Sequence, residues 1–239
     1  MIKIQGLTKT YGNKEAVSQL NLQLNDGEVF GLLGPNGAGK STTIKMITGI
    51  LAPTSGDILI DGISITSNPI EAKKNFGFVP DSPDMFLGMS GLDYLTFIAS
   101  VFKLDAETAK NESISLAKEF NIFDSLNELI INYSHGMRQK IFIIGSLLHN
   151  PRNWILDEPL TGLDPDSAFK VKNIMKERAT KGGSVIFSTH VLDVAEKVCD
   201  KVGIIDKGIL LFSGTLEELR SRENYKSGDL EDLFLNLTK

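Results

Sequence analysis

A glycine-rich stretch carries the clearest chemistry in the sequence. Residues 34–41 read Gly-Pro-Asn-Gly-Ala-Gly-Lys-Ser, which fits the pattern G-x-x-x-x-G-K-[ST], and they stand between an apolar run and a predicted helix. Small residues let successive backbone N–H groups turn toward phosphate oxygens, and the following helix directs its positive end at the same charge. Lys40 adds a cation near the β and γ phosphates, and the Ser41 hydroxyl can bind Mg2+. The alternative interpretation is a plain glycine-rich turn.

Two adjacent acids follow an apolar run later in the chain, where residues 154–158 read Trp-Ile-Leu-Asp-Glu. The apolar run predicts a buried strand that brings Asp157 to its end. There Asp157 can hold Mg2+ through water, and Glu158 is placed to polarise an attacking water. Adjacent acids at a strand end can also cap the next helix, and the residues alone leave that alternative open.

A histidine closes another apolar run, where residues 188–190 read Ser-Thr-His. If that run is a parallel strand, His190 lies at the same sheet edge as the two acids, near a γ phosphate. The alternative is a histidine with a purely structural role.

The strands and helices that must position these residues can be predicted from the spacing of apolar residues along the chain. Short apolar runs between turn signals predict strands, and a period near 3.6 predicts helices. A helix is expected from Lys40 to about Ile50, a helical insertion from Gly91 to Leu148 with Asp105 as one cap, and a helix between Asp166 and Thr180. Strands are expected at residues 1–4, 20–24, 29–33, 58–60, 154–156, 184–188 and 202–205. This order predicts an α/β fold with a mostly parallel sheet and helices on both faces.

Composition narrows the classes of protein that this chain can belong to. It has 239 residues, 41% hydrophobic and 23% charged, with 22 Gly and 8 Pro, which excludes collagen-like, coiled-coil and disordered chains. The net charge of -5 excludes a global positive field that would attract nucleic acid, so any polyanion site must be local.

The cysteine count and the apolar runs give further limits. Cys199 is the single cysteine, which excludes an intrachain disulfide and a cysteine metal cluster, and we expect it to be a small buried apolar side chain. The amino terminus lacks an apolar signal core. The longest strongly apolar run, residues 141–148, is shorter than the roughly 18 residues that a membrane helix needs.

One further segment points to a family. Residues 133–140 read Tyr-Ser-His-Gly-Met-Arg-Gln-Lys and precede the two acids by one short helix. This segment resembles the LSGGQ signature of the nucleotide-binding subunit of ATP-binding cassette (ABC) transporters, and the resemblance covers nearly the whole chain. His135 replaces a glycine of the usual signature, and Met137 replaces its glutamine.

The resemblance implies a P-loop NTPase (RecA-like) fold with an antiparallel β subdomain and an inserted α-helical subdomain. It implies a single ABC ATPase domain over residues 1–239. Its parts would be a nucleotide-binding core at 1–84 and 151–215, a helical signature subdomain at 85–150 and a C-terminal tail at 216–239.

The resemblance also implies a dimer. In this family the signature completes the ATP site of the opposite protomer, so Ser134 and Gly136 would contact a γ phosphate bound by a second subunit. The amino end of the following helix would offer N–H groups to that phosphate. On local sequence alone, Ser134 can equally be a helix cap. Residues 162–165, Gly-Leu-Asp-Pro, resemble the D-loop that joins the two sites, although alone they would be a turn.

Three further positions are assigned through the resemblance. Tyr11 matches the aromatic residue that stacks on adenine, with Val17 close to the nucleotide, although an aromatic near a strand end can simply pack. Asp81 stands where the family has a glutamine; a carboxylate can still bind the metal but can only accept hydrogen bonds. Asp81 can also be a turn acid.

The implied cofactors are ATP and Mg2+, and the implied site residues form three groups. The catalytic residues would be Glu158, His190 and Lys40. The nucleotide-binding residues would be Tyr11, Val17, Gly34, Pro35, Asn36, Gly37, Ala38, Gly39, Lys40, Ser41, Thr42, Ser134, Gly136 and Asp164. The metal ligands would be Ser41, Asp157 and Asp81.

The function expected from the resemblance is ATP hydrolysis that drives export through separate membrane permease subunits. The partners would be those permeases and a second ATP-binding subunit, in a homodimer or a heterodimer at the cytoplasmic face of the cell membrane. No nucleic acid partner is expected. The alternatives are an importer subunit and a soluble ABC ATPase that remodels ribosomes or nucleic acid.

Several segments bear on these choices. The Asp81 substitution, the signature variant, the turn at residues 212–215 and the stretch at 230–234 favour an exporter by resemblance. The apolar residues 85–87 could dock a cytoplasmic helix of a permease, or they could be buried under the helical insertion.

Overall fold

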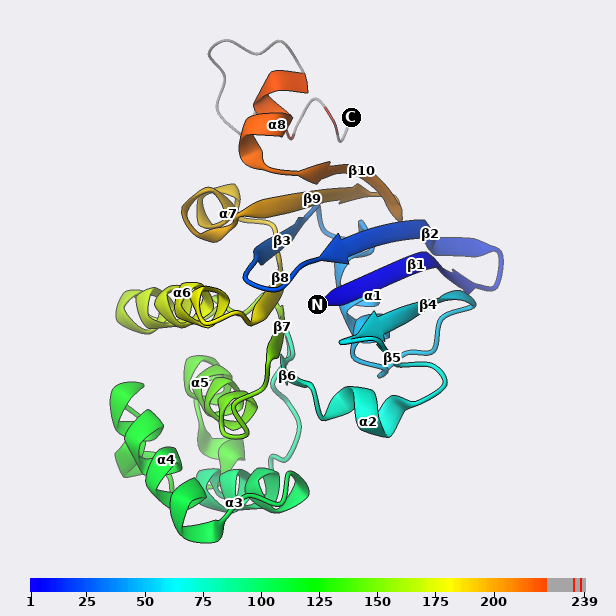
Figure 1. Cartoon of the computed structure of the whole chain (residues 1–239). Coiled ribbons are helices and arrows are strands. Elements are labelled where there is room, and N and C mark those ends of the chain that lie inside the picture. Colours follow the sequence, from blue (N-terminus) through cyan, green and yellow to red (C-terminus); the bar gives the residue numbers. More distant parts are fainter. Residues whose placement is uncertain (223–233, 235–236, 238–239) are drawn as a thin grey trace.

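The computed structural model of the chain describes residues 1–222, 234 and 237, which form two β-sheets and a set of helices (Figure 1). The strands are β1 (Ile2–Tyr11), β2 (Lys14–Leu24), β3 (Val29–Leu33), β4 (Ser55–Ile60), β5 (Ile63–Ser64), β6 (Phe76–Val79), β7 (Asn153–Asp157), β8 (Ser184–Thr189), β9 (Lys201–Asp206) and β10 (Ile209–Gly214). The α-helices are α1 (Lys40–Ile47), α2 (Pro69–Lys73), α3 (Gly91–Val101), α4 (Ala106–Glu119), α5 (His135–Leu147), α6 (Pro165–Thr180), α7 (Leu192–Val198) and α8 (Leu216–Arg222), and short 3-10 helices lie at Phe123–Ser125 and Ile130–Asn132.

The larger sheet has six strands in the order β10-β9-β3-β8-β7-β6. All of its neighbouring pairs are parallel except β10 with β9. The predicted α/β class with a mostly parallel sheet is therefore confirmed. Because β3, β7 and β8 are parallel neighbours, the segments that follow them meet at one edge of the sheet.

The two faces of this sheet belong to two hydrophobic cores. On β7, Trp154 and Leu156 belong to the core that also contains apolar residues of α3, α5 and α6, whereas Ile155 belongs to the core with α1 and the smaller sheet. Side chains alternate between the faces of a strand, so every residue of this five-residue strand is buried. A strand buried on both faces has a continuous apolar run, which is the pattern visible in the sequence.

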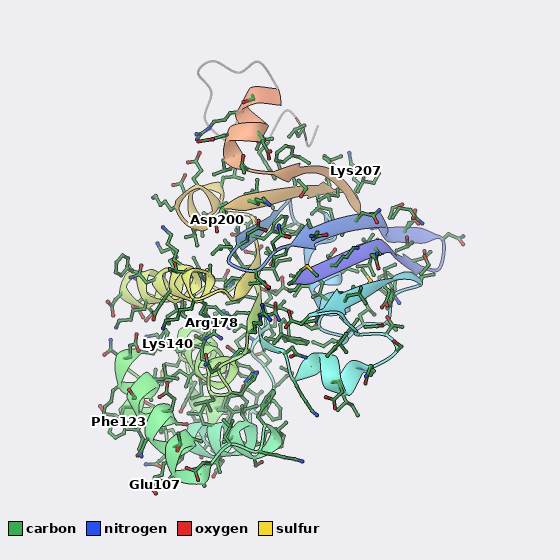
Figure 2. The ribbon with its side chains drawn as sticks, in the orientation of Figure 1. Glu107, Phe123, Lys140, Arg178, Asp200 and Lys207 are labelled. Carbon is green, nitrogen blue, oxygen red and sulfur yellow. The ribbon has the colours of Figure 1, made fainter. Side chains whose placement is uncertain are left out.

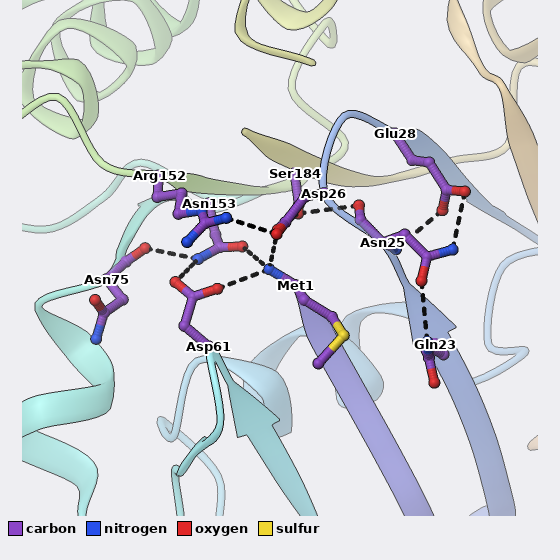
Figure 3. A network of polar contacts seen from close by, with 10 residues as sticks. All are labelled: Met1, Gln23, Asn25, Asp26, Glu28, Asp61, Asn75, Arg152, Asn153 and Ser184. Carbon is purple, nitrogen blue, oxygen red and sulfur yellow. Dashed lines mark hydrogen bonds and ion pairs between the residues drawn. The ribbon is translucent and has the colours of Figure 1, made fainter. Parts of the chain in front are cut away.

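The smaller sheet is antiparallel, with strand order β2-β1-β4-β5. A polar network links it to the larger sheet (Figure 3). In that network the Met1 ammonium donates to Asp26 at 2.5 Å and to Asp61 at 2.7 Å. Asn153, at the start of β7, donates to Asp61 at 2.8 Å, and Arg152 pairs with Asp26 at 2.6 Å. Charged groups therefore connect the start of β1 to the start of β7.

The helical insertion comprises α3, α4 and α5, and its boundaries follow local signals. Ser90 and Asp105 cap α3 and α4 by accepting hydrogen bonds from the backbone N–H groups of Asp93 and Thr108. The insertion is tied to the core through α5, where the Trp154 indole N–H donates to the Ser146 hydroxyl at 2.9 Å, and both groups are buried.

Several boundaries differ from those predicted. The helix expected to reach Ile50 ends at Ile47, because Gly49 adopts a left-handed conformation with φ of 63°. The first two strands are longer than predicted, at ten and eleven residues, and their pairing contains register shifts. Cys199 is half-buried as a whole residue, but its sulfur packs against Gly31, and burial of the thiol raises its pKa. Among the helices in the described part of the chain, none is long and apolar enough to cross a membrane.

Candidate functional site

The glycine-rich loop connects β3 to α1 and contacts β2 on one side and the turn between β9 and β10 on another. Gly37 and Gly39 have φ values of 81° and 111°, which favour glycine. A Cβ on Gly39 would lie 2.8 Å from the Ala16 carbonyl oxygen, so the loop runs close to β2. The Ala38 carbonyl accepts a hydrogen bond of 2.8 Å from the backbone N–H of Gly208, in the turn between β9 and β10. The loop conformation is therefore fixed by its surroundings.

Lys40 is the first residue of α1, and its buried side chain extends back to the start of this loop. Its ammonium donates to the carbonyl oxygens of Gly34 at 2.7 Å and Pro35 at 3.3 Å, and it lies 3.6 Å from Glu158 Oε1. This position brings a cation from the loop to the carboxylate that follows β7. Pro35 and Thr42 are half-buried and Asn36 is exposed, so part of the loop faces the surface.

Asp157 sits at the end of β7 between two hydroxyl groups. Ser188 Oγ donates to Asp157 Oδ1 at 2.6 Å, and Ser41 Oγ donates to the same oxygen at 3.1 Å. Burial raises the pKa of Asp157, and the nearby charges of Asp81 and Glu158 also raise it, against the lowering effect of the two hydroxyls. A buried carboxylate in this position is stabilised by a cation.

This arrangement fits a magnesium ion. Mg2+ prefers oxygen ligands and is usually bound by one or two carboxylates together with substrate phosphates and water. The Ser41 hydroxyl and the Asp157 carboxylate are hard oxygen donors within 3.1 Å of each other, beside the glycine-rich loop. Among the described residues, no group of three or more His, Cys, Asp or Glu side chains forms a metal cluster.

Glu158 and His190 form a pair at the same sheet edge. His190 Nδ1 lies 3.1 Å from both carboxylate oxygens of Glu158. The backbone N–H of Glu158 donates to Ser188 Oγ at 2.9 Å, and Glu158 has a φ of 46°, which is uncommon for a residue with a side chain. The backbone is thus held in a strained form that turns the carboxylate toward Lys40 and His190.

The signature segment and the D-loop contact each other within the chain. Ser134 caps α5 by accepting a hydrogen bond from Met137 N at 3.2 Å, so the capping role considered from the sequence is present. Gly136 approaches Gly162 so closely that a Cβ on Gly136 would lie 2.6 Å from the Gly162 carbonyl oxygen. The His135 ring occupies the space where a Cβ of Gly162 would stand.

An ion pair strengthens this contact. Lys140 Nζ lies 2.7 Å from Asp164 Oδ2, at the start of α6. Figure 2 labels Lys140, which belongs to α5. Asp164 also caps α6 by accepting hydrogen bonds from the N–H and the hydroxyl of Ser167. The hydrogen bond from Lys140 and those from Ser167 hold the pKa of Asp164 well below its usual range. The Asp164 carboxylate is therefore held in place by Lys140 and Ser167 of the same chain.

The other three residues assigned through the family resemblance, Tyr11, Val17 and Asp81, differ in how exposed they are. Tyr11 is exposed at the end of β1, which leaves its ring accessible. Val17 is fully buried and its Cγ2 would contact a Cβ on Gly39 at 3.4 Å, so it supports the loop from beneath instead of lining its open side. Asp81 is exposed after β6, yet close enough to Asp157 to raise the pKa of that carboxyl.

The apolar segment at residues 85–87 is partly buried and partly exposed, so neither burial under the helical insertion nor exposure for docking describes all of it. Leu87 packs against the core, whereas Met85 and Phe86 are 46% and 38% exposed. The Phe86 ring lies 5.3 Å from that of Tyr94, measured between centroids. Tyr94 in turn lines a groove of about 270 Å³, whose other apolar and aromatic lining residues include Ile50, Phe76, Phe78, Ile98 and Phe102.

Two contributors to the site did not emerge from the sequence patterns. The sequence pattern places Ser188 only at the end of a strand, although its position two residues before His190 indicates that it lies near the acids. Lys140 was seen only as part of the signature, although a lysine on an apolar helix face is a signal for a buried ion pair.

Comparisons with known proteins agree with this geometry. A family model described as ABC transporter matches residues 17–161. The chain is 34% identical over 239 residues, 100% of its length, to the ABC-type transporter ATP-binding protein EcsA of Bacillus subtilis (strain 168), and covers 97% of that protein. It is also 34% identical over 220 residues, 92% of its length, to the daunorubicin/doxorubicin resistance ATP-binding protein DrrA of Streptomyces peucetius, and covers 67% of it.

Solved structures give the same result. The ATP binding subunit of an ABC transporter superposes with a TM-score of 0.94 at 30% identity, with 100% of both chains covered. A dimeric ATP-binding cassette bound to ADP and phosphate superposes with a TM-score of 0.82 at 24% identity, covering 90% of this chain and 99% of that one. The second likeness shows the fold alone.

Proposed function

This chain belongs to the ATP-binding subunits of the ABC transporter family and is an ABC ATPase, and from that premise we propose that it drives export through separate membrane permease subunits. The family assignment and the ATPase activity predicted from the sequence are thereby confirmed. Export, the permease partners and the roles of individual residues are the proposal.

The observation that carries the proposal is the convergence of four groups at one sheet edge. Lys40 from the glycine-rich loop, Asp157 and Glu158 after β7, and His190 after β8 are joined by contacts of 3.6 Å or less through Glu158 and Ser188. Phosphoryl transfer needs a cation at the transferred phosphate, a metal-side carboxylate and a group that orients water. These residues supply each of them.

The proposed roles follow from the contacts. Loop N–H groups and Lys40 bind the phosphates of ATP, and Glu158 accepts a hydrogen bond from the attacking water and draws off its proton. His190 Nδ1, 3.1 Å from Glu158, would orient the Glu158 carboxylate. Ser41 and Asp157, with Asp81 as a further candidate, would hold Mg2+, which when bound supplies positive charge to the phosphate oxygens.

We infer that a second ATP-binding subunit completes each site. Ser134, Gly136 and the amino end of α5 would face the γ phosphate held by the other subunit, since a helix amino end with free N–H groups favours an anion. Asp164 of the D-loop, held by Lys140 and Ser167 of its own chain, would lie beside this shared site. A solved cassette with this fold is dimeric, which supports the proposed two-subunit assembly.

The permease contact is assigned to the groove beside α3. Phe86 contacts Tyr94, which lines this groove, and the neighbouring Met85 is also exposed. Exposed apolar side chains beside a groove suit a docking helix. Such a contact would place the chain at the cytoplasmic face of the membrane. The drug-resistance name of one relative favours export over import. Residues 230–233, part of the stretch thought to favour an exporter, lie outside the described residues.

The proposal is tested first at Glu158. In Glu158→Gln, ATP binding should persist while hydrolysis falls by about 10²- to 10⁴-fold, because an amide cannot take a proton from water. With ATP, closed dimers should accumulate on size-exclusion chromatography. Glu177→Gln is the matched control, since Glu177 is exposed and forms an ion pair with Lys181, which directly follows α6. Near-normal turnover by Glu158→Gln would contradict the assigned role.

Partner capture separates the remaining alternatives. Co-purification with a membrane permease supports the transport function, and uptake or efflux of that complex in vesicles decides between import and export. Recovery with ribosomes and no membrane protein would instead favour the soluble remodelling ATPase.

A further inference from the structure

A lysine ammonium covers one face of the exposed ring of Tyr11. Lys9 and Tyr11 both belong to β1, two residues apart. Lys9 Nζ lies over the Tyr11 ring, 5.2 Å from its centroid. That distance is within the roughly 6 Å over which a cation is attracted to an aromatic face. The ring is 51% exposed, so much of its surface stays accessible despite the lysine.

The lysine is itself held in place. Its Nζ donates a hydrogen bond of 2.8 Å to the carbonyl oxygen of Ala52, in the connection between α1 and β4. That connection is bound to β1, since Thr54 N donates to the Thr8 carbonyl at 2.8 Å and Thr10 N donates to Thr54 Oγ1 at 3.0 Å. The ammonium therefore has a fixed position, set by the backbone rather than by solvent.

We propose that Lys9 is a positioning residue for the nucleotide base, which holds the Tyr11 ring by one face so that the accessible face can stack on a purine. The inference rests on the proposed function, in which ATP is the ligand and Tyr11 contacts its base.

Two physical effects give Lys9 this role. An exposed aromatic side chain loses rotamer freedom when it stacks, and a ring that is already held avoids part of that loss. The negative charge on a ring face also opposes direct stacking on another π system, and a cation on the opposite face reduces that repulsion. Both effects act only on the base contact and leave the phosphate contacts unchanged.

The test compares a ligand that has a base with one that lacks it. Calorimetry measures the Kd of Mg-ATP and of Mg-tripolyphosphate for the full chain and its variants. Lys9→Met should weaken ATP binding by about two- to five-fold, the range expected of an exposed cation–π contact. Tripolyphosphate binding should be unchanged, and Lys9→Arg, which keeps the cation, should return ATP affinity to that of the parent. Lys3→Met, on the same strand, is the control and should alter neither affinity.

A double variant decides whether Lys9 acts through the ring. In the Tyr11→Ala background, Lys9→Met should have no further effect on ATP affinity. Equal weakening of ATP and tripolyphosphate, or additive effects of the two substitutions, would overturn the inference. If Tyr11→Ala weakens ATP binding and Lys9→Met does not, the inference alone fails. If Tyr11→Ala has no effect, the base contact in the proposed function fails as well, and if ATP does not bind the parent chain, the whole proposal fails.

Discussion

Replacing Asp164 should destabilise the protein much more than replacing Lys140, although the two residues form one ion pair. The side chain of Lys140 is 10% exposed and that of Asp164 is 47% exposed. Loss of the carboxylate leaves an ammonium buried without a counter-charge. Loss of the lysine leaves a carboxylate that water can reach, and that still accepts hydrogen bonds from Ser167.

The expected magnitudes follow from this difference. Removing one partner of a fully buried ion pair costs about 3–5 kcal/mol, and the partial exposure of this pair reduces the cost to about 2–3 kcal/mol for Asp164→Ser. Serine is chosen because its hydroxyl can still cap α6, so the cap is not lost with the charge. Lys140→Met keeps a chain of similar length and removes the buried charge, so its cost should stay within about 1 kcal/mol.

Urea unfolding followed by circular dichroism measures both values. The double variant Asp164→Ser with Lys140→Met should recover to within about 1 kcal/mol of Lys140→Met alone, because no unpaired charge remains. Glu177→Ser serves as a control for an exposed ion pair, and its cost should be much smaller than that of Asp164→Ser because water screens the charges. The reasoning is refuted if Asp164→Ser costs no more than Lys140→Met, or if the two costs simply add.

Two other perturbations test separate parts of the molecule. Burial lowers the pKa of His149 to about 4, so the free energy of unfolding should fall by up to about 3 kcal/mol as the pH is lowered from 6.5 toward 4. Unfolding measured across this range should show a shallower decline for His149→Phe than for the parent chain. Parallel curves for the two proteins would contradict this assignment to His149. Replacing Met85 and Phe86 with Ser should abolish stimulation of the ATPase by the permease while basal turnover survives, and loss of folding or unchanged stimulation would argue against the docking surface.

The sequence patterns predicted the positions of the candidate site residues at strand ends more accurately than the architecture around them. The glycine-rich loop, Asp157, Glu158 and His190 were placed correctly at strand ends because apolar runs mark buried parallel strands, and turn or polar residues follow them directly. The resemblance to a known family then supplied the fold. Strand order in the larger sheet was beyond the patterns, since the arrangement β10-β9-β3-β8-β7-β6 depends on contacts between segments far apart in the chain.

Contacts over long sequence distances account for most of what was missed. The approach of Gly136 to Gly162 and the pair of Lys140 with Asp164 join segments that are more than twenty residues apart. The position of Val17 beneath the loop likewise depends on how the smaller sheet packs against the larger one. Register shifts between β1 and β2 hid most of both strands, because a bulge breaks the alternation on which strand prediction relies.

The bond between Trp154 and Ser146 gives the protein an internal optical reporter. Trp154 is the single tryptophan of the chain, and its indole lies buried between the core strand β7 and the helical insertion. Its fluorescence emission should therefore be blue-shifted while α5 stays packed on the sheet. The emission should move to longer wavelength when α5 separates from the sheet and water reaches the indole. Motion between the insertion and the core can thus be followed by intrinsic fluorescence, in the unmodified chain and without an attached dye.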